Sequence, residues 1–171
     1  IDVVDIKGDD SLHNEVQGAY NALGTQGGVV YLPSGEYMFR KPDTVKQHNT
    51  VTIGSNTVLR YPSGKGSHQP FRGIYAYNKH DLYFSGITFI GTQDSNQTGI
   101  WFESVSYSTI ENCKFDSMGL RAIGLNNILV TSADSVCHHN KIQNNFISNG
   151  NSNPGLTLGS AIFLIEGACY N

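Results

Sequence analysis

The sequence predicts an all-β fold in which short parallel strands wind into a solenoid, a β-helix, with one capping α-helix near the N-terminus. Three observations lead to this fold class. Short apolar segments recur through most of the chain. The 19 Gly and 16 Asn residues supply many positions that tolerate left-handed backbone at turns. No segment after residue 23 has a convincing helical period.

The first 23 residues predict a strand followed by the helix. Residues 2–6 are apolar and strand-like, and Leu12, Val16, Tyr20 and Leu23 recur at spacings of three and four, which predicts an amphipathic helix over residues 11–23. Gly24 is placed to end that helix in a left-handed cap. We expect the helix to cover the open end of the solenoid, where strand edges would otherwise be exposed.

Residues 1–49 are therefore predicted to form an N-terminal capping region, which strands over residues 28–39 complete. Residues 50–171 are predicted to form the coils. One set of similar segments begins at Phe84, Ile110 and Ile142, and a second contains Ile74, Ile100, Ile123 and Ile162. Their offsets lie mostly in the twenties, with insertions, which indicates a solenoid rather than a β-sandwich. We expect the last coil to be truncated, because its strand would be left uncovered.

The N-terminal residues resemble those of a known superfamily. Residues 2–6, then Gly8-Asp9-Asp10, the predicted helix, and the run from Gly27 to Tyr37 with its Pro33-Ser34-Gly35 turn are similar to the N-terminal signature of the pectate-lyase-like β-helix superfamily. The usual Gly-Asp-Gly turn is incomplete, which makes the chain a divergent member. The motifs of polygalacturonases and alginate epimerases are absent from the sequence.

This resemblance implies a right-handed parallel β-helix with three sheets running along it. It also places the turn between the second and third sheets at Gly86, Asn112 and Asn144. The Ile74, Ile100, Ile123 and Ile162 segments then fall on the first sheet, which in the superfamily forms one wall of a carbohydrate groove.

Strand alternation then predicts the side chains that face outward on the first sheet. The predicted substrate-binding residues are Tyr75, Tyr77, Trp101, Asn126 and Arg72. Flat aromatic rings beside amides and a carboxylate suit sugars, and exposed aromatic groups generally mark a binding site. Two alternatives remain open: loops cover these rings, or the rings contact a neighbouring subunit.

The predicted catalytic residues are Glu103, Asp116, Asp94 and Arg121. A glycoside hydrolase needs two carboxyl groups about 5–10 Å apart, so Glu103 was paired with Asp94 or with Asp116. A polysaccharide lyase needs a base and a cation to neutralise the uronate, a part that Arg72 and Arg121 fit. A solvated surface role remains the alternative for each of these residues.

Several classes of protein and site are disfavoured. A net charge of −3 with 15% charged residues and no basic block argues against a nucleic-acid partner, and no apolar run is long enough for membrane insertion. Cys113, Cys137 and Cys169 lack metal-type spacing and are predicted to be small buried residues. His138 and His139 are interpreted as surface or packing residues. No metal site or cofactor is predicted, with calcium left open.

These expectations support three hypotheses. The first is a phage tailspike-like protein, extracellular or on the virion, that forms a homotrimer and binds or depolymerises a bacterial surface polysaccharide such as capsule, O-antigen or teichoic acid. The second is a secreted polysaccharide lyase or glycoside hydrolase acting on a uronate polymer. The third is a non-catalytic structural or adhesive solenoid. Whether the chain is an enzyme stays undecided at this stage.

Overall fold

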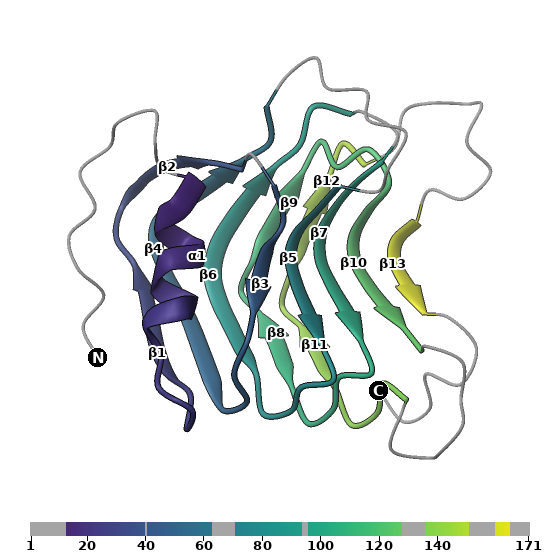
Figure 1. The fold of residues 1–171 in the computed structure, drawn as a ribbon. Helices are drawn as coiled ribbons and strands as arrows, with labels where there is room; N and C mark the ends of the chain where they lie inside the picture. Colours follow the sequence, from purple (N-terminus) through teal and green to yellow (C-terminus); the bar gives the residue numbers. More distant parts are fainter. Residues whose placement is uncertain are drawn as a thin grey trace.

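The computed structural model describes residues 13–39, 41–62, 71–93, 96–127, 136–150 and 160–164. One helix and two parallel β-sheets make up this part of the chain, with strands from successive coils stacked side by side (Figure 1). The helix α1 (His13–Ala22) lies at the N-terminal end of the stack. The predicted strand at residues 2–6 lies outside the described residues.

The strands pair in the order expected of a solenoid. The eight-stranded sheet contains β1 (Gly28–Leu32), β2 (Gly35–Met38), β4 (Thr50–Arg60), β6 (Tyr83–Ile90), β8 (Thr109–Glu111), β9 (Lys114–Asp116), β11 (Lys141–Gln143) and β12 (Phe146–Ser148). The five-stranded sheet contains β3 (Asp43–Val45), β5 (Phe71–Tyr77), β7 (Gln97–Glu103), β10 (Arg121–Asn126) and β13 (Ser160–Leu164). Because the chain alternates between the two sheets, each strand pairs in parallel with a strand of the next coil.

We expected three sheets, whereas the described strands form two. The difference lies at the predicted turn within the larger sheet, where Asn56, Asn112 and Asn144 have φ near 52° and Gly86 has φ 73°. In the later coils this turn separates β8 from β9 and β11 from β12, but β4 and β6 run through it. These two continuous strands join both arms of the bent sheet through their hydrogen bonds.

The helix α1 closes the edge of the five-stranded sheet. Val16, Tyr20 and Leu23 are buried, as the periodicity predicted. Strand β3 is the last of the described strands in its sheet, so within the described residues one of its backbone edges has no strand partner. The Gln17 carboxamide occupies that edge: its Oε1 accepts from the Thr44 N–H at 2.6 Å and its Nε2 donates to the Thr44 carbonyl at 3.1 Å. The side chain thereby replaces a neighbouring strand.

Replacing Gln17 with Leu is expected to lower the free energy of unfolding by about 1–3 kcal/mol, because two partly buried backbone groups of Thr44 lose their partners. Urea denaturation followed by circular dichroism measures this change. Asn21→Ala is the matched control, since Asn21 is exposed and accepts a hydrogen bond from the same Gln17 carboxamide at 3.1 Å without contacting the backbone of Thr44. Equal losses in the two variants would contradict the edge-closing role.

The left-handed residue after the helix is Gly27, not Gly24 as predicted. Gly27 has φ 78°, and its N–H donates to the Gly24 carbonyl at 3.0 Å. A Cβ at Gly27 would lie 2.1 Å from the His48 carbonyl oxygen and 2.5 Å from that of Asn49. The close approach of the next coil therefore decides where the glycine is required, and the helical period alone does not reveal that contact.

The interior is a stack of apolar side chains, one layer from each coil. Phe89 and Phe115 stack with ring centroids 4.8 Å apart and an interplanar angle of 7°, which matches the spacing of neighbouring strands. Cys113 and Cys137 are free thiols buried in this core, as predicted, and Cys169 lies outside the described residues. No helix in the described ranges is long and apolar enough to cross a membrane.

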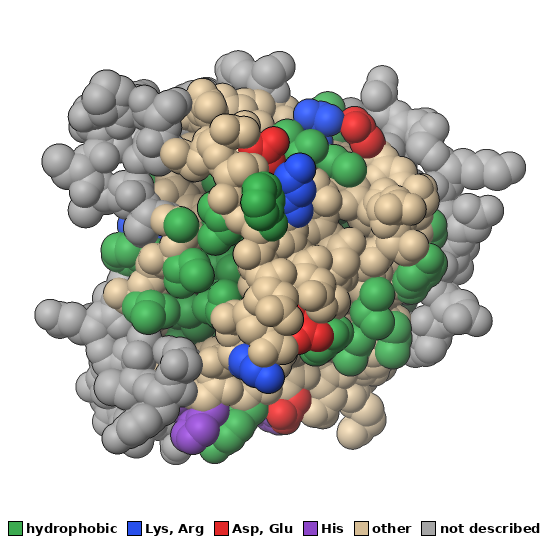
Figure 2. All heavy atoms as spheres, turned by 180° about the vertical axis from the view of Figure 1, so that it is seen from behind, with side chains coloured by type: hydrophobic (Ala, Val, Ile, Leu, Met, Phe, Trp, Pro, Cys, Tyr) green, Lys and Arg blue, Asp and Glu red, His purple; other side chains and the backbone are tan. Residues whose placement is uncertain are grey.

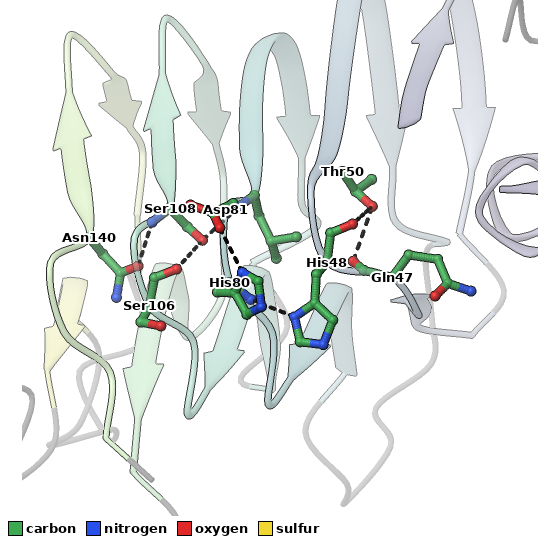
Figure 3. Close-up of polar contacts among 9 residues, drawn as sticks. Gln47, His48, Thr50, His80, Asp81, Ser106, Ser108 and Asn140 are labelled. Atoms are coloured by element: carbon green, nitrogen blue, oxygen red, sulfur yellow. Dashed lines mark hydrogen bonds and ion pairs between the residues drawn. The ribbon is translucent and has the colours of Figure 1, made fainter. Parts of the chain in front are cut away.

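Polar side chains of successive coils also lie side by side at the corner that leads from the five-stranded to the eight-stranded sheet (Figure 3). Ser108 Oγ accepts from the Leu82 N–H at 2.9 Å, and the Ser108 N–H donates to Asn140 Oδ1 at 3.1 Å. Asn140 Nδ2 in turn donates to the Val105 carbonyl at 2.7 Å. Each side chain satisfies the backbone of a neighbouring turn, so the coils remain aligned at this corner.

Imidazole rings line the outside of the same corner. His48 and His80 stack with ring centroids 4.0 Å apart (Figure 3). Further along, His138 and His139 pack against the ring of Tyr107, with centroids at 5.1 and 4.9 Å. Within the described ranges, no three His, Cys, Asp or Glu side chains group closely enough to hold a metal ion.

Candidate functional site

The outer face of the five-stranded sheet gathers most of the residues that the sequence singled out. Parallel pairing aligns Tyr75 with Trp101, Trp101 with Gly124, and Gly124 with Phe163. A second row aligns Tyr77, Glu103 and Asn126, and a third aligns Arg72, Thr98 and Arg121. We call these residues together the arginine–aromatic face. Ile74, Ile100 and Ile123 occupy the opposite side of the same strands and are fully buried in the core.

Two glycines explain why Arg72 reaches this face. By strict alternation Arg72 would share the inner side with Ile74. However, a Cβ at Gly73 would lie 2.3 Å from Tyr61 Oη, and one at Gly99 would lie 2.7 Å from the Phe115 ring, so both positions also face the interior. Strand β5 pairs with β7 on both sides of Gly73 and Gly99, but the regular pairing is interrupted at these two glycines. The strands are irregular here, and the residues before the glycines turn outward.

Glu103 organises the centre of the face. Its Oε1 accepts from Trp101 Nε1–H at 2.7 Å and pairs with Arg72 Nη2 at 2.9 Å, and its Oε2 accepts from the Tyr75 hydroxyl at 2.6 Å. The residue is only 5% exposed. Since both carboxylate oxygens are engaged, the side chain holds three neighbours in place.

Tyr75 is a hydrogen-bond donor at neutral pH. Burial, followed by the hydrogen bond to the Glu103 carboxylate and the charge of that group, raises the pKa of Tyr75 to about 12. The hydroxyl therefore keeps its proton across the physiological range. Its ring also lies under the Arg72 guanidinium, whose Cζ is 4.9 Å from the ring centroid.

Both arginines lie against the single tryptophan. Arg72 Cζ and Arg121 Cζ are 5.0 and 5.3 Å from the Trp101 ring centroid, and Arg121 Cζ is 3.7 Å from the centroid of Phe163. Such contacts stabilise a guanidinium by about 0.5–2 kcal/mol. Arg72 is neutralised by Glu103, whereas no carboxylate in the described part of the chain pairs with Arg121.

Gly124 is a site residue that the sequence interpretation did not assign. A Cβ at this position would lie 2.3 Å from Trp101 Cε3 and 2.4 Å from Cζ3, so the indole packs directly on the glycine backbone. The pairing of Gly124 with Trp101 in neighbouring coils is the signal that points to it. A glycine opposite the one tryptophan leaves room for a ring to lie flat on the sheet.

The structure places the predicted binding residues on this face with different exposures. Tyr77 is 48% exposed, and Tyr75, Arg72 and Asn126 are partly exposed. Trp101 was expected to be exposed and is wrongly predicted in that respect, because it is only 7% exposed. Packing by the two guanidinium groups and by Gly124 covers the indole. Their roles in binding stay predictions.

The predicted acid/base residues are not all brought together. Asp116 lies in β9 of the other sheet, where hydrogen bonds from Asn149 and Ser148 hold its pKa below the ordinary value. Asp116 comes before the first residue of β10, whereas Glu103 is the last residue of the parallel strand β7. The two residues therefore lie toward opposite ends of these paired strands, and strand positions five residues apart are separated by about 16 Å. The structure therefore does not show a pair of Glu103 with Asp116. Asp94 lies outside the described residues.

Figure 2 shows the surface of the molecule from behind. Charged side chains there are few, and acidic and basic groups lie near one another on the described surface. On the eight-stranded sheet, Arg60 donates to both carboxylate oxygens of Glu36, at 3.2 and 2.9 Å. Of the described arginines, Arg60 and Arg72 each pair with a glutamate, whereas Arg121 has no carboxylate partner among the described residues.

Comparison with known proteins places the chain in a family. No curated protein sequence matches it significantly. A crystal structure from Parabacteroides merdae ATCC 43184, named a "putative glycosyl hydrolase", superposes with a TM-score of 0.68 at 16% identity, covering 88% of this chain and 73% of that chain. This likeness shows the fold. The family model described as "Right handed beta helix region" matches residues 43–170. With that match over most of its length, the chain belongs to the right-handed β-helix family.

Proposed function

We propose that this β-helix binds a polysaccharide along the arginine–aromatic face. The observation that carries the proposal is the set of aromatic and guanidinium groups that Glu103 fixes on the outside of a flat parallel sheet. Aromatic rings pack on the apolar faces of sugars, while Tyr, Arg and Asn side chains hydrogen-bond to hydroxyl groups. The name of the P. merdae structural neighbour supports a carbohydrate ligand.

The ligand that we propose is a bacterial surface polysaccharide, such as capsule, O-antigen or teichoic acid. In this hypothesis the chain is part of a phage tailspike-like protein, extracellular or on the virion. A homotrimer is then expected, and light scattering of the protein in solution measures it. A monomer that cleaves uronate polymers would instead favour a secreted lyase or hydrolase, and tight binding without turnover would favour an adhesive solenoid.

The first test is a binding and depolymerisation screen. The protein is incubated with bacterial surface glycans and pectin-like polymers, binding is measured, and the products are sized by mass spectrometry. Saturable binding to at least one glycan is expected. If no polymer binds and every polymer stays intact, the proposal is wrong and the arginine–aromatic face must be tested as a subunit interface.

Glycoside hydrolysis is the second candidate function, favoured by the name of the structural neighbour. It requires a second carboxyl group about 5–10 Å from the first. Asp94, in the segment just before β7, is the predicted partner of Glu103. If the screen yields oligosaccharides, Asp94→Asn is expected to abolish their formation while binding persists. Undiminished cleavage by that variant would exclude Asp94 as the acid or base.

Replacing Tyr77 with Ala is expected to weaken glycan binding roughly tenfold, because an exposed ring loses its stacking contact with a sugar. Isothermal titration with the glycan found in the screen measures the change. Tyr31→Ala is the matched control, since Tyr31 is similarly exposed, at 41%, but lies on the eight-stranded sheet. Equal affinity of the two variants would argue against the assigned face.

A further inference from the structure

The row formed by Arg72, Thr98 and Arg121 contains an unusual set of unsatisfied polar atoms. Buried side-chain nitrogen or oxygen atoms without a hydrogen-bond partner occur at four positions in the described part of the chain. Three of them are Arg72 Nε, Thr98 Oγ1 and Arg121 Nε, which belong to three adjacent strands in register. Native structures rarely leave such groups unpaired, because each costs about 1–3 kcal/mol.

The charge of this row is also incompletely balanced. Arg72 pairs with Glu103 at 2.9 Å, but Arg121 has no carboxylate partner among the described residues. Partial burial of Arg121 lowers its pKa, which reflects the cost of removing its charge from water. An arginine nevertheless stays protonated in proteins. The row therefore keeps one uncompensated positive charge beside unsatisfied donors.

Aromatic packing holds the Arg121 guanidinium in place. Its Cζ lies 3.7 Å from the Phe163 ring centroid and 5.3 Å from that of Trp101. A guanidinium that stacks on rings still presents N–H groups at its edge, and that edge matches the two oxygens of a carboxylate, sulfate or phosphate group. The Thr98 hydroxyl, in the strand between the two arginines, adds a neutral donor.

We propose that the Arg72–Thr98–Arg121 row is a subsite for an anionic substituent of the polysaccharide, with Arg121 as the group that neutralises it. The inference rests on the proposed glycan-binding function and adds the class of ligand: a glycan that carries carboxylate, sulfate or phosphate groups. The bound anion supplies an acceptor to the partly exposed guanidinium groups of Arg72 and Arg121, beside the three unsatisfied atoms. The anion also balances the positive charge of Arg121, which Glu103 does not neutralise.

The test compares polymers that differ in their charged group. Polygalacturonate supplies carboxylates, dextran sulfate supplies sulfates, polyribitol phosphate supplies phosphates, and carboxyl-reduced polygalacturonate and dextran are the neutral counterparts. Tighter binding of one anionic class than of its neutral counterpart is expected, and the class that binds best identifies the anion. Affinity is also expected to fall with rising salt concentration.

Arg121→Gln is expected to weaken binding of that anionic polymer roughly tenfold and binding of the neutral polymer less than about twofold. Lys114→Gln is the matched control, because Lys114 also lies over an aromatic ring, that of Phe146, but on the other sheet. It is expected to change neither affinity. The melting temperature of Arg121→Gln is expected to stay close to that of the wild type.

Thr98→Val separates binding from folding. It removes an unpaired buried hydroxyl, so stability is expected to hold or rise while affinity for the anionic polymer falls roughly threefold to tenfold. Thr52→Val is its counterpart: the Thr52 hydroxyl is hydrogen-bonded to Tyr20 at 3.1 Å, so stability is expected to fall and affinity to persist.

The possible results distinguish this inference from the proposed function. Equal binding of anionic and neutral polymers, or full anionic affinity in Arg121→Gln, overturns the anionic subsite and leaves glycan binding standing. Failure to bind any polymer in the panel or in the wider screen overturns both. Both are supported if the protein prefers an anionic polymer and if affinity for that polymer falls in Arg121→Gln and Thr98→Val but not in Lys114→Gln.

Discussion

Asp43→Asn is expected to stabilise the protein by roughly 2–4 kcal/mol at pH 8 and to have little effect near pH 4, where the folded carboxyl is protonated and the unfolded one is only about half ionised. Asp43 is 2% exposed, and its Oδ1 has no hydrogen-bond partner. Burial raises the pKa of Asp43 from 3.8 to about 7, against a smaller opposing effect of Lys41. Ionisation is therefore much harder in the folded state than in the unfolded state.

The sign of the pH dependence follows from this difference. Between about pH 4 and pH 7 the unfolded chain has lost the Asp43 proton while the folded protein retains it, so stability falls as pH rises and levels off above pH 7. Asn cannot ionise, and the variant should lose this part of the pH dependence. Urea denaturation between pH 4 and pH 8.5 measures both curves.

Asp116→Asn provides a control of opposite sign. Hydrogen bonds from Asn149 and Ser148 lower the pKa of Asp116, so its ionised form stabilises the fold at neutral pH and that contribution disappears in acid. The variant is expected to be less stable than the wild type at pH 7. If wild type and Asp43→Asn gave parallel curves across this range, Asp43 would not be the buried, hard-to-ionise group described.

Gly124→Ala is expected to displace Trp101, to destabilise the protein by about 1–3 kcal/mol and to weaken glycan binding. The new Cβ would lie 2.3 Å from Trp101 Cε3, so the indole has to lift from the sheet. Movement of the ring breaks the 2.7 Å hydrogen bond to Glu103 and separates the indole from both guanidinium groups. The arginine–aromatic face would then lose its fixed arrangement.

Fluorescence measures this displacement directly, because Trp101 is the only tryptophan in the chain. A red-shifted emission maximum and stronger quenching by acrylamide are expected in Gly124→Ala. Gly18→Ala is the control: nothing lies within 4 Å of a Cβ at Gly18, and a helical Gly-to-Ala change stabilises by about 0.5–1 kcal/mol. Unchanged emission in Gly124→Ala would contradict the displacement of Trp101, and shifted emission with full affinity would show that glycan binding does not depend on the position of the indole.

The parallel solenoid with its N-terminal helix is predictable from the sequence, because the relevant signals are local. The apolar spacing of Val16, Tyr20 and Leu23 placed the helix, and the repeated apolar segments placed Ile100 and Ile123 in the core. The family resemblance placed a turn at Asn112 and Asn144, and both have left-handed backbone, which asparagine tolerates. Each of these follows from the period of a strand or helix, or from the steric freedom of one residue.

The contacts between side chains of different coils are not predictable from the sequence alone. Strand alternation put Glu103 on the outer side of the sheet, but its burial and its three hydrogen-bond donors depend on residues up to 31 positions away in sequence. The irregularity at Gly73 and Gly99 turned Arg72 outward, and the same coil-to-coil register set Gly124 beneath Trp101. It also separated Asp116 from Glu103. Alternation is a property of one strand, whereas register and bend arise from the packing of several coils, which no single segment encodes.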